Sequence, residues 1–172
     1  MSNLVHVKGR VYANMSKTTE GNFCAIVAPY VIKASEIVFK EWREQGIEVP
    51  SNLVIHVKKI REANTRGLCQ YNNADKSIVI TIDPHTLNGH QLVATVAHEL
   101  RHAWQYMTGK LSLKLHRKTA TRAVYDRVWE GRQFAKHKNF TQYQNAPWEK
   151  DANSYAERFI KLYKDSFPEV IL

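Results

Sequence analysis

The sequence has little of what marks secreted, disulfide-stabilised or membrane-spanning proteins. Its two cysteines, Cys24 and Cys69, form neither a disulfide framework nor a C-x-x-C motif. The N-terminal segment MSNLVHVKGR lacks the apolar core of a signal peptide. The longest apolar runs, such as SIVITI at 77–82, are too short to cross a bilayer. We therefore expect a cytoplasmic protein with reduced thiols and no membrane segment.

Internal repeats and low-complexity segments are also absent. The chain has 172 residues, of which 44% are hydrophobic and 24% charged. These proportions are ordinary for a globular chain that can bury a core. Residues 1–172 are therefore expected to form a single domain.

Positive charge is unevenly distributed along the chain. The net charge is +9. Residues 103–146 hold nine lysines and arginines but two acids, which is +7 of that total. Such a region could attract nucleic acid or an acidic protein. The alternative is a solvated helical face, and no nucleic-acid-reading motif accompanies the basic residues.

The pattern of apolar residues predicts an α+β layout. A helix is expected over 29–46, opened by Pro29 and ended by Gly46, followed by a β-branched strand over 52–60. GLCQY and SIVITI flank the turn-rich NNADK and should form an antiparallel hairpin. A small mixed or antiparallel sheet would then pack on helices.

The second half of the chain is expected to be mostly helical. Asn88 is a good N-cap and Gly109 a good terminator for a helix over 89–108. The other expected elements are a basic amphipathic helix over 115–137, a loop over 139–146, and a last helix from Pro147 to about Lys164.

The stretch HELRH, residues 98–102, lies in the middle of the expected helix 89–108. Residues four apart share one side of a helix, so His98 and His102 can present two imidazoles to one ion. Zn²⁺ suits two neutral imidazoles and a carboxylate. Glu99 points about 100° away, where it can reach a water at the open position of the ion. This H-E-x-x-H spacing is typical of zinc metalloproteases, in which the Glu is the general base.

A catalytic zinc site needs a third protein ligand. Glu149 falls in the first turn of the last expected helix and shares a face with Ala152, Asn153 and Ala156. The small alanines favour close approach to another helix, and Asn153 could hydrogen-bond a ligating histidine. Asp151 lies about 200° away from Glu149, so one of the two can face the metal, and Glu149 is preferred.

The motif H-E-x-x-H followed by E-x-x-A-N-x-x-A resembles the gluzincin metallopeptidases, and is similar to the ImmA/IrrE-like and HtpX-like peptidases. The resemblance covers about residues 50 to 165. It implies a zincin-like fold, His98, His102 and Glu149 as zinc ligands, and Glu99 as the base. It also implies that SIVITI is the edge strand lining the substrate groove. The expected reaction is hydrolysis of peptide bonds in an unidentified intracellular protein.

Two other interpretations remain open. The spacing of His116 from His102 resembles SprT/Spartan-like proteases, in which a third histidine follows the helix and the enzyme works on DNA-bound proteins. His116 would then be the third ligand, although LHRK lacks the glycine that usually follows it. A zincin-like fold without activity could instead bind nucleic acid or protein through the basic region 103–146.

The developing oxyanion of peptide hydrolysis also needs a hydrogen-bond donor. Tyr125, His137 and Tyr143 lie in the half of the chain from which such a donor would come. For each of them, an ordinary aromatic or surface residue is the preferred interpretation.

Overall fold

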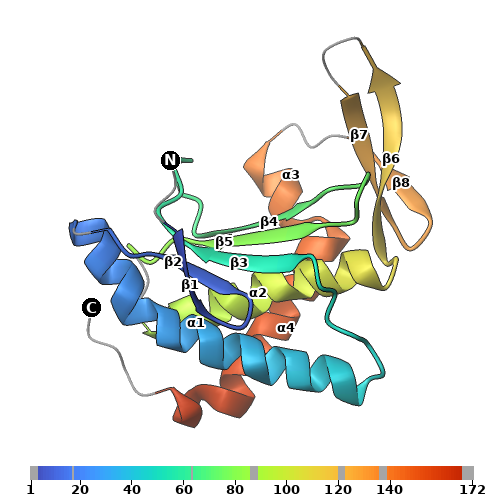
Figure 1. Ribbon diagram of the computed structural model, residues 1–172. Helices are drawn as coiled ribbons and strands as arrows, with labels where there is room; N and C mark the ends of the chain where they lie inside the picture. The colour runs from blue at the N-terminus through green and yellow to red at the C-terminus, as the bar shows by residue number, and fades with distance from the viewer. Residues whose placement is uncertain are drawn as a thin grey trace.

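The computed structural model describes residues 4–16, 18–62, 64–85, 89–119, 123–135 and 139–167. It has two sheets, and the three long helices lie beneath the larger one (Figure 1). The expected α+β class is confirmed. The larger sheet has the strand order β1-β2-β3-β5-β4, and the smaller has the order β6-β7-β8. The strands of the larger sheet are β1 (Leu4–Lys8), β2 (Val11–Asn14), β3 (Leu53–Val57), β4 (Gly67–Tyr71) and β5 (Ile78–Ile82).

The larger sheet is mixed. Strands β2, β3 and β5 run parallel to one another, while β1 pairs antiparallel with β2 at one edge and β4 pairs antiparallel with β5 at the other. The predicted hairpin of β4 and β5 is confirmed. The resemblance was wrong about the edge, however, because SIVITI (β5) lies between β3 and β4. Its side chains are almost all buried, as expected for an internal strand, and GLCQY (β4) forms the edge.

Helix α1 (Thr19–Glu44) starts ten residues before the expected beginning at Pro29. Thr18 caps it by accepting a hydrogen bond from the Gly21 amide. Pro29 lies on the exposed side, and the buried stripe continues through it from Cys24 to Trp42. A long helix held by such packing tolerates the one backbone hydrogen bond that proline removes.

Helix α1 is also long and apolar enough, by length and composition, to cross a membrane over Glu20–Glu44. The sequence analysis expected no membrane segment because it considered only uninterrupted apolar runs. Polar residues interrupt the apolar ones in α1, so this helix was overlooked. Its apolar stripe is part of the main core, where Val27, Val31 and Ala34 are fully buried. Burial against the sheet and α2 (Gly89–Met107) accounts for this apolar character within the fold.

The predicted helix over 115–137 is wrong. Residues 111–134 form a second sheet of three antiparallel strands, β6 (Leu111–Lys118), β7 (Ala123–Trp129) and β8 (Arg132–Phe134). Glu130 and Gly131 both have positive φ, which is the backbone of a two-residue hairpin turn between β7 and β8. A bulge near His116 shifts the alternation of side chains in β6, so the strand period is hidden in the sequence.

The C-terminal part follows the prediction more closely. Helix α4 spans Pro147–Tyr163, as expected, and ends in a single 3-10 turn. The expected loop over 139–146 contains a short helix, α3 (Phe140–Gln144), because Asn139 caps it through a hydrogen bond from the Gln142 amide. Helix α2 ends before Gly109, whose φ is +73°, as predicted. The predicted N-cap Asn88 lies outside the described residues.

Candidate metal centre

His98 and His102 lie one turn apart on α2 and point toward the same spot. Their Nε2 atoms are 3.0 Å apart, and their rings meet edge to face. His102 is buried, while the side chain of His98 is 19% exposed. The helix therefore brings together two imidazole nitrogens, as the sequence predicted.

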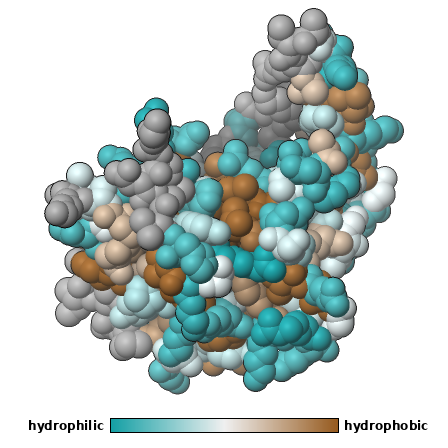
Figure 2. Space-filling view, in the orientation of Figure 1, coloured by the Kyte–Doolittle hydropathy of each residue, from teal (hydrophilic) through white to brown (hydrophobic). Residues whose placement is uncertain are grey.

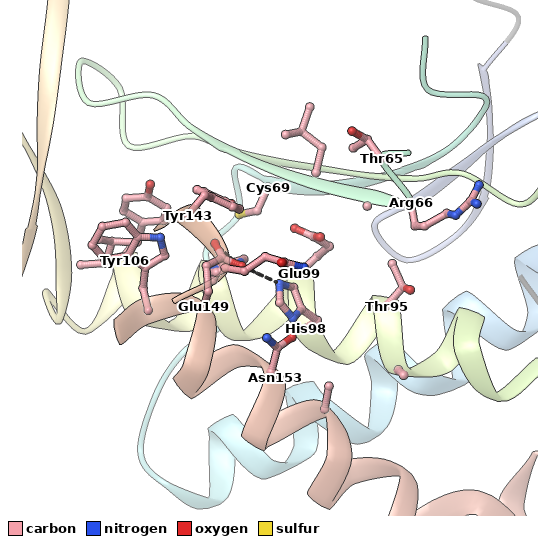
Figure 3. Close-up of a pocket in the computed structure, with 18 of the residues that line it drawn as sticks. Thr65, Arg66, Cys69, Thr95, His98, Glu99, Tyr106, Tyr143, Glu149 and Asn153 are labelled. Atoms are coloured by element: carbon pink, nitrogen blue, oxygen red, sulfur yellow. Dashed lines mark hydrogen bonds and ion pairs between the residues drawn. The ribbon is translucent and has the colours of Figure 1, made fainter. Parts of the chain in front are cut away.

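Glu149 reaches this pair from the first turn of α4. Its Oε2 atom is 3.4 Å from Nε2 of His98, and its Oε1 atom is 3.3 Å from Nε2 of His102 (Figure 3). In a tetrahedral zinc site with ligand bonds of about 2.0–2.1 Å, ligand atoms are about 3.3 Å apart. The three residues form a group that could hold a metal ion. The structure therefore brings together the three candidate ligands named from the sequence.

The carboxylate of Glu149 is buried and keeps its charge. Burial alone would raise the pKa of this carboxyl, but the neighbouring histidines and a hydrogen bond with Tyr143 hold it well below its usual range. Although His102 is close, Oε1 of Glu149 meets no donor at hydrogen-bond geometry among the described residues. A buried, ionised oxygen of this kind is suited to a cation.

Glu99 lies next to the histidines but is held in a different way. Its side chain is 7% exposed, and burial raises the pKa of the carboxyl. The backbone amide of Cys69, in the edge strand β4, donates a hydrogen bond to it. The carboxylate therefore faces the same cleft as the histidines without belonging to the metal-binding group.

Gly67 lets strand β4 approach Glu99 this closely. A Cβ atom at Gly67 would lie 2.6 Å from Oε1 of Glu99 and 2.7 Å from Cγ2 of Thr95. Any other residue would have to displace the Glu99 side chain or the strand. The sequence signal is a glycine at the start of a predicted strand, which often marks close backbone approach.

Gln105 is a site residue that the sequence reasoning missed. Its Oε1 atom is 2.9 Å from Nδ1 of His102, and its Nε2 atom donates to the Trp148 carbonyl and to Asp151. These two acceptors fix the orientation of the amide, so its oxygen faces the imidazole. Nδ1 of His102 then carries a proton, so in the neutral imidazole the lone pair lies on Nε2, toward His98 and Glu149.

The other candidate ligands lie elsewhere. Asp151 forms a bidentate ion pair with Arg101, at 2.7 and 3.0 Å. His116 lies on β6 with a side chain 58% exposed, and its Nδ1 is 2.9 Å from Asp126. Asn153 lies below His98 and lines the cleft. The expected contact with a histidine is made by Gln105 instead, whose side-chain oxygen accepts a hydrogen bond from Nδ1 of His102. The structure thus favours Glu149 over both alternatives.

The metal-binding group lies in an open cleft of about 600 Å³ between β4, α2, α4 and the base of the β6–β7 hairpin. Of the aromatic residues considered as oxyanion donors, Tyr143 lines the cleft and hydrogen-bonds to Glu149. Tyr125 is exposed further along the hairpin. His137 lies outside the described residues.

Comparison with protein-family models, with curated proteins and with solved structures found no match to this chain.

Proposed function

We propose that this protein is a zinc-dependent metallopeptidase with a zincin-like fold of the gluzincin type. The observation that carries the proposal is the convergence of His98, His102 and Glu149, with ligand-atom distances of 3.0–3.4 Å, beside a separately held Glu99. Two imidazoles and one carboxylate are a known protein ligand set of catalytic zinc, which leaves one position open.

In the proposed reaction, the metal ion and the side chain of Glu99 have separate roles. A bound zinc ion would polarise a carbonyl group and lower the pKa of a water molecule. Glu99 would be the general base, whose carboxylate takes a proton from the attacking water and gives it to the leaving amine. Its burial and the Cys69 amide keep the carboxylate aimed at the cleft, so the base needs no reorganisation before the reaction.

The surroundings of the site support a peptide as the substrate. Strand β4 is the antiparallel edge of the sheet and lines the cleft with Leu68 and Cys69. An extended polypeptide can pair with such an edge through its backbone. Strand β4 would therefore be the edge strand that lines the substrate groove, a role that the gluzincin resemblance assigned to SIVITI. The buried Ala152 and Ala156 on α4 agree with that resemblance as well.

A cytoplasmic location remains part of the proposal. The two cysteines in the described chain are free. Burial raises the pKa of both thiols, which keeps them protonated and unreactive. Free thiols are typical of proteins in a reducing compartment such as the cytoplasm.

The test is hydrolysis of an unfolded protein by zinc-loaded wild type and by Glu99→Gln, with the fragments identified by mass spectrometry. We expect cleavage by the wild type, loss of cleavage with a chelator, and recovery on adding zinc. Glu99→Gln should bind zinc and cleave at least about a hundredfold more slowly. Cleavage by the zinc-loaded variant at the wild-type rate would contradict the proposal.

A second candidate function is nucleic-acid binding. It is favoured by one observation, the exposure of Lys114, Arg117 and Lys118 on the projecting β6–β7 hairpin. Affinity for duplex DNA that falls steeply with salt, and that Arg117→Gln with Lys118→Gln removes, would support it. Affinity that is independent of salt or unchanged in this variant would contradict it.

A further inference from the structure

Arg127 is the charged residue of the β6–β7 hairpin that lines the metal-site cleft. It lies on β7 opposite Leu113, and it is half-buried. Side chains alternate along a strand, so its neighbours in the chain, Asp126 and Val128, face the other side of the hairpin. The position therefore directs a guanidinium group toward the cleft and away from the exposed basic residues.

Aromatic side chains hold this guanidinium in place. It lies 5.7 Å from the ring centre of Tyr143 and 5.5 Å from that of Trp148. It also hydrogen-bonds to the side chain of Tyr106. Within the part of the chain that the structure describes, no carboxylate forms an ion pair with Arg127. A guanidinium has five N–H donors, so the bond to Tyr106 by itself leaves others that can reach a ligand.

The charge of the cleft favours an anionic ligand. The acids that line it are Glu99 and Glu149. A bound divalent ion would offset both of them. The lining also contains Arg66 and Arg127 and no further acid. A cleft with this balance is complementary to a substrate that carries negative charge.

The same face of the hairpin continues outward from Arg127. Leu115 and Tyr125 are the next directly paired residues on that face, and they are 48% and 42% exposed. The hairpin stands clear of the body of the molecule, at the upper right of Figure 2. A chain leaving the cleft along this face would therefore meet a cation first and an apolar pair next.

We propose that Arg127 is a specificity-determining residue that binds a carboxylate of the peptide substrate near the scissile bond. The carboxylate is either an acidic side chain or the C-terminus of the peptide, since a guanidinium pairs with both in the same bidentate geometry. This inference rests on the proposed peptidase function.

The experiment uses two random decapeptide libraries, one with both ends blocked and one with a free C-terminal carboxylate. Zinc-loaded wild type, Arg127→Gln, Arg127→Lys and Lys114→Gln are compared, and the cleaved bonds are read by mass spectrometry. Lys114→Gln is the matched control because Lys114, opposite Asp126, lies on the other face of the hairpin. Zinc content and melting temperature are measured for every variant.

We expect wild type to prefer Asp or Glu at one fixed position of the blocked library, or to require the free C-terminus. The first result identifies a side-chain carboxylate and the second a C-terminal one. Arg127→Gln should lower the ratio of acidic to neutral cleavage by about tenfold or more, because a hydrogen-bonded charge is lost. Arg127→Lys should keep part of the preference, and Lys114→Gln should keep all of it.

Four results would overturn the inference, and the rates and ratios distinguish them. A wild type without carboxylate preference, or an Arg127→Gln variant with both the wild-type ratio and the wild-type rates, removes Arg127 as a determinant and leaves the peptidase intact. Equal loss of acidic and neutral cleavage in Arg127→Gln assigns Arg127 a merely structural role. A zinc-loaded wild type that cleaves neither library overturns the proposed function itself.

Discussion

The side-chain oxygen of Gln105 lies 2.9 Å from Nδ1 of His102, on the opposite side of the imidazole from the Nε2 atom that faces Glu149. This contact belongs to a chain of hydrogen bonds that runs from Arg101 through Asp151 and Gln105 to His102. The chain fixes the rotation of His102, one of the three residues that could hold a metal ion. Under the proposed function, this contact orients the imidazole for the cation in advance.

Loss of the Gln105 amide should weaken metal binding. Gln105→Leu leaves Nδ1 of His102 without its acceptor, so we expect zinc affinity to fall about 10–100-fold. Asn153→Ala is the comparison, because Asn153 was the expected partner of a ligating histidine and is exposed on α4. It should bind zinc nearly as well as wild type. Competition with a chromophoric chelator measures both affinities, and equal losses would contradict the assignment to Gln105.

Gly67→Ala should separate catalysis from metal binding. The atoms nearest to the new methyl group belong to the side chains of Glu99 and Thr95, and not to the three candidate metal ligands. We expect the zinc content of wild type and loss of most hydrolysis. Gln70→Ala, an exposed change in the same strand, is the control for damage to β4. Full activity in Gly67→Ala would show that the position of Glu99 does not matter.

Glu149 and Asp151 should differ sharply when each is changed to alanine. Glu149→Ala removes a ligand and should abolish stoichiometric zinc binding. Asp151→Ala breaks its partly buried pair with Arg101, so it should cost about 1–3 kcal/mol of stability and weaken zinc binding less. Metal analysis and thermal unfolding give both quantities. If Asp151→Ala lost more zinc than Glu149→Ala, Asp151 and not Glu149 would be the third ligand.

His116→Ala should leave zinc binding unchanged. His116 pairs with Asp126 on the hairpin and is not in the metal-binding group. The variant should therefore hold one zinc per chain, as measured by elemental analysis. If it lost the metal, the SprT/Spartan-like interpretation would replace the gluzincin-like one.

Most of the candidate site was predictable because its residues lie on helices with strong local signals. The spacing of His98 and His102 needs only helical periodicity, and Pro147 fixes the start of the helix that carries Glu149. The choice of Glu149 over Asp151 followed from the alanines on its face. Gln105 was not found because its role depends on the contact of α2 with Trp148 and Asp151, which lie more than 40 positions further along the chain.

The fold was less predictable where local patterns conflict. Val124 and Val128 have helical spacing, while their alternation with Tyr125 and Arg127 is that of a strand, and the bulge at His116 conceals the second pattern. Pro29 resembles a helix start because nothing local reveals that the buried stripe begins at Cys24. The position of β5 within the sheet depends on its pairing with β3, which is not encoded in the hairpin itself.

The central claim is that His98, His102 and Glu149 hold one zinc ion. The most direct test is the metal content of purified wild type beside His98→Ala and Glu149→Ala, prepared without chelators. The account predicts about one zinc per chain in the wild type and none in either variant. Wild-type protein without metal, or variants that keep the zinc, would contradict it.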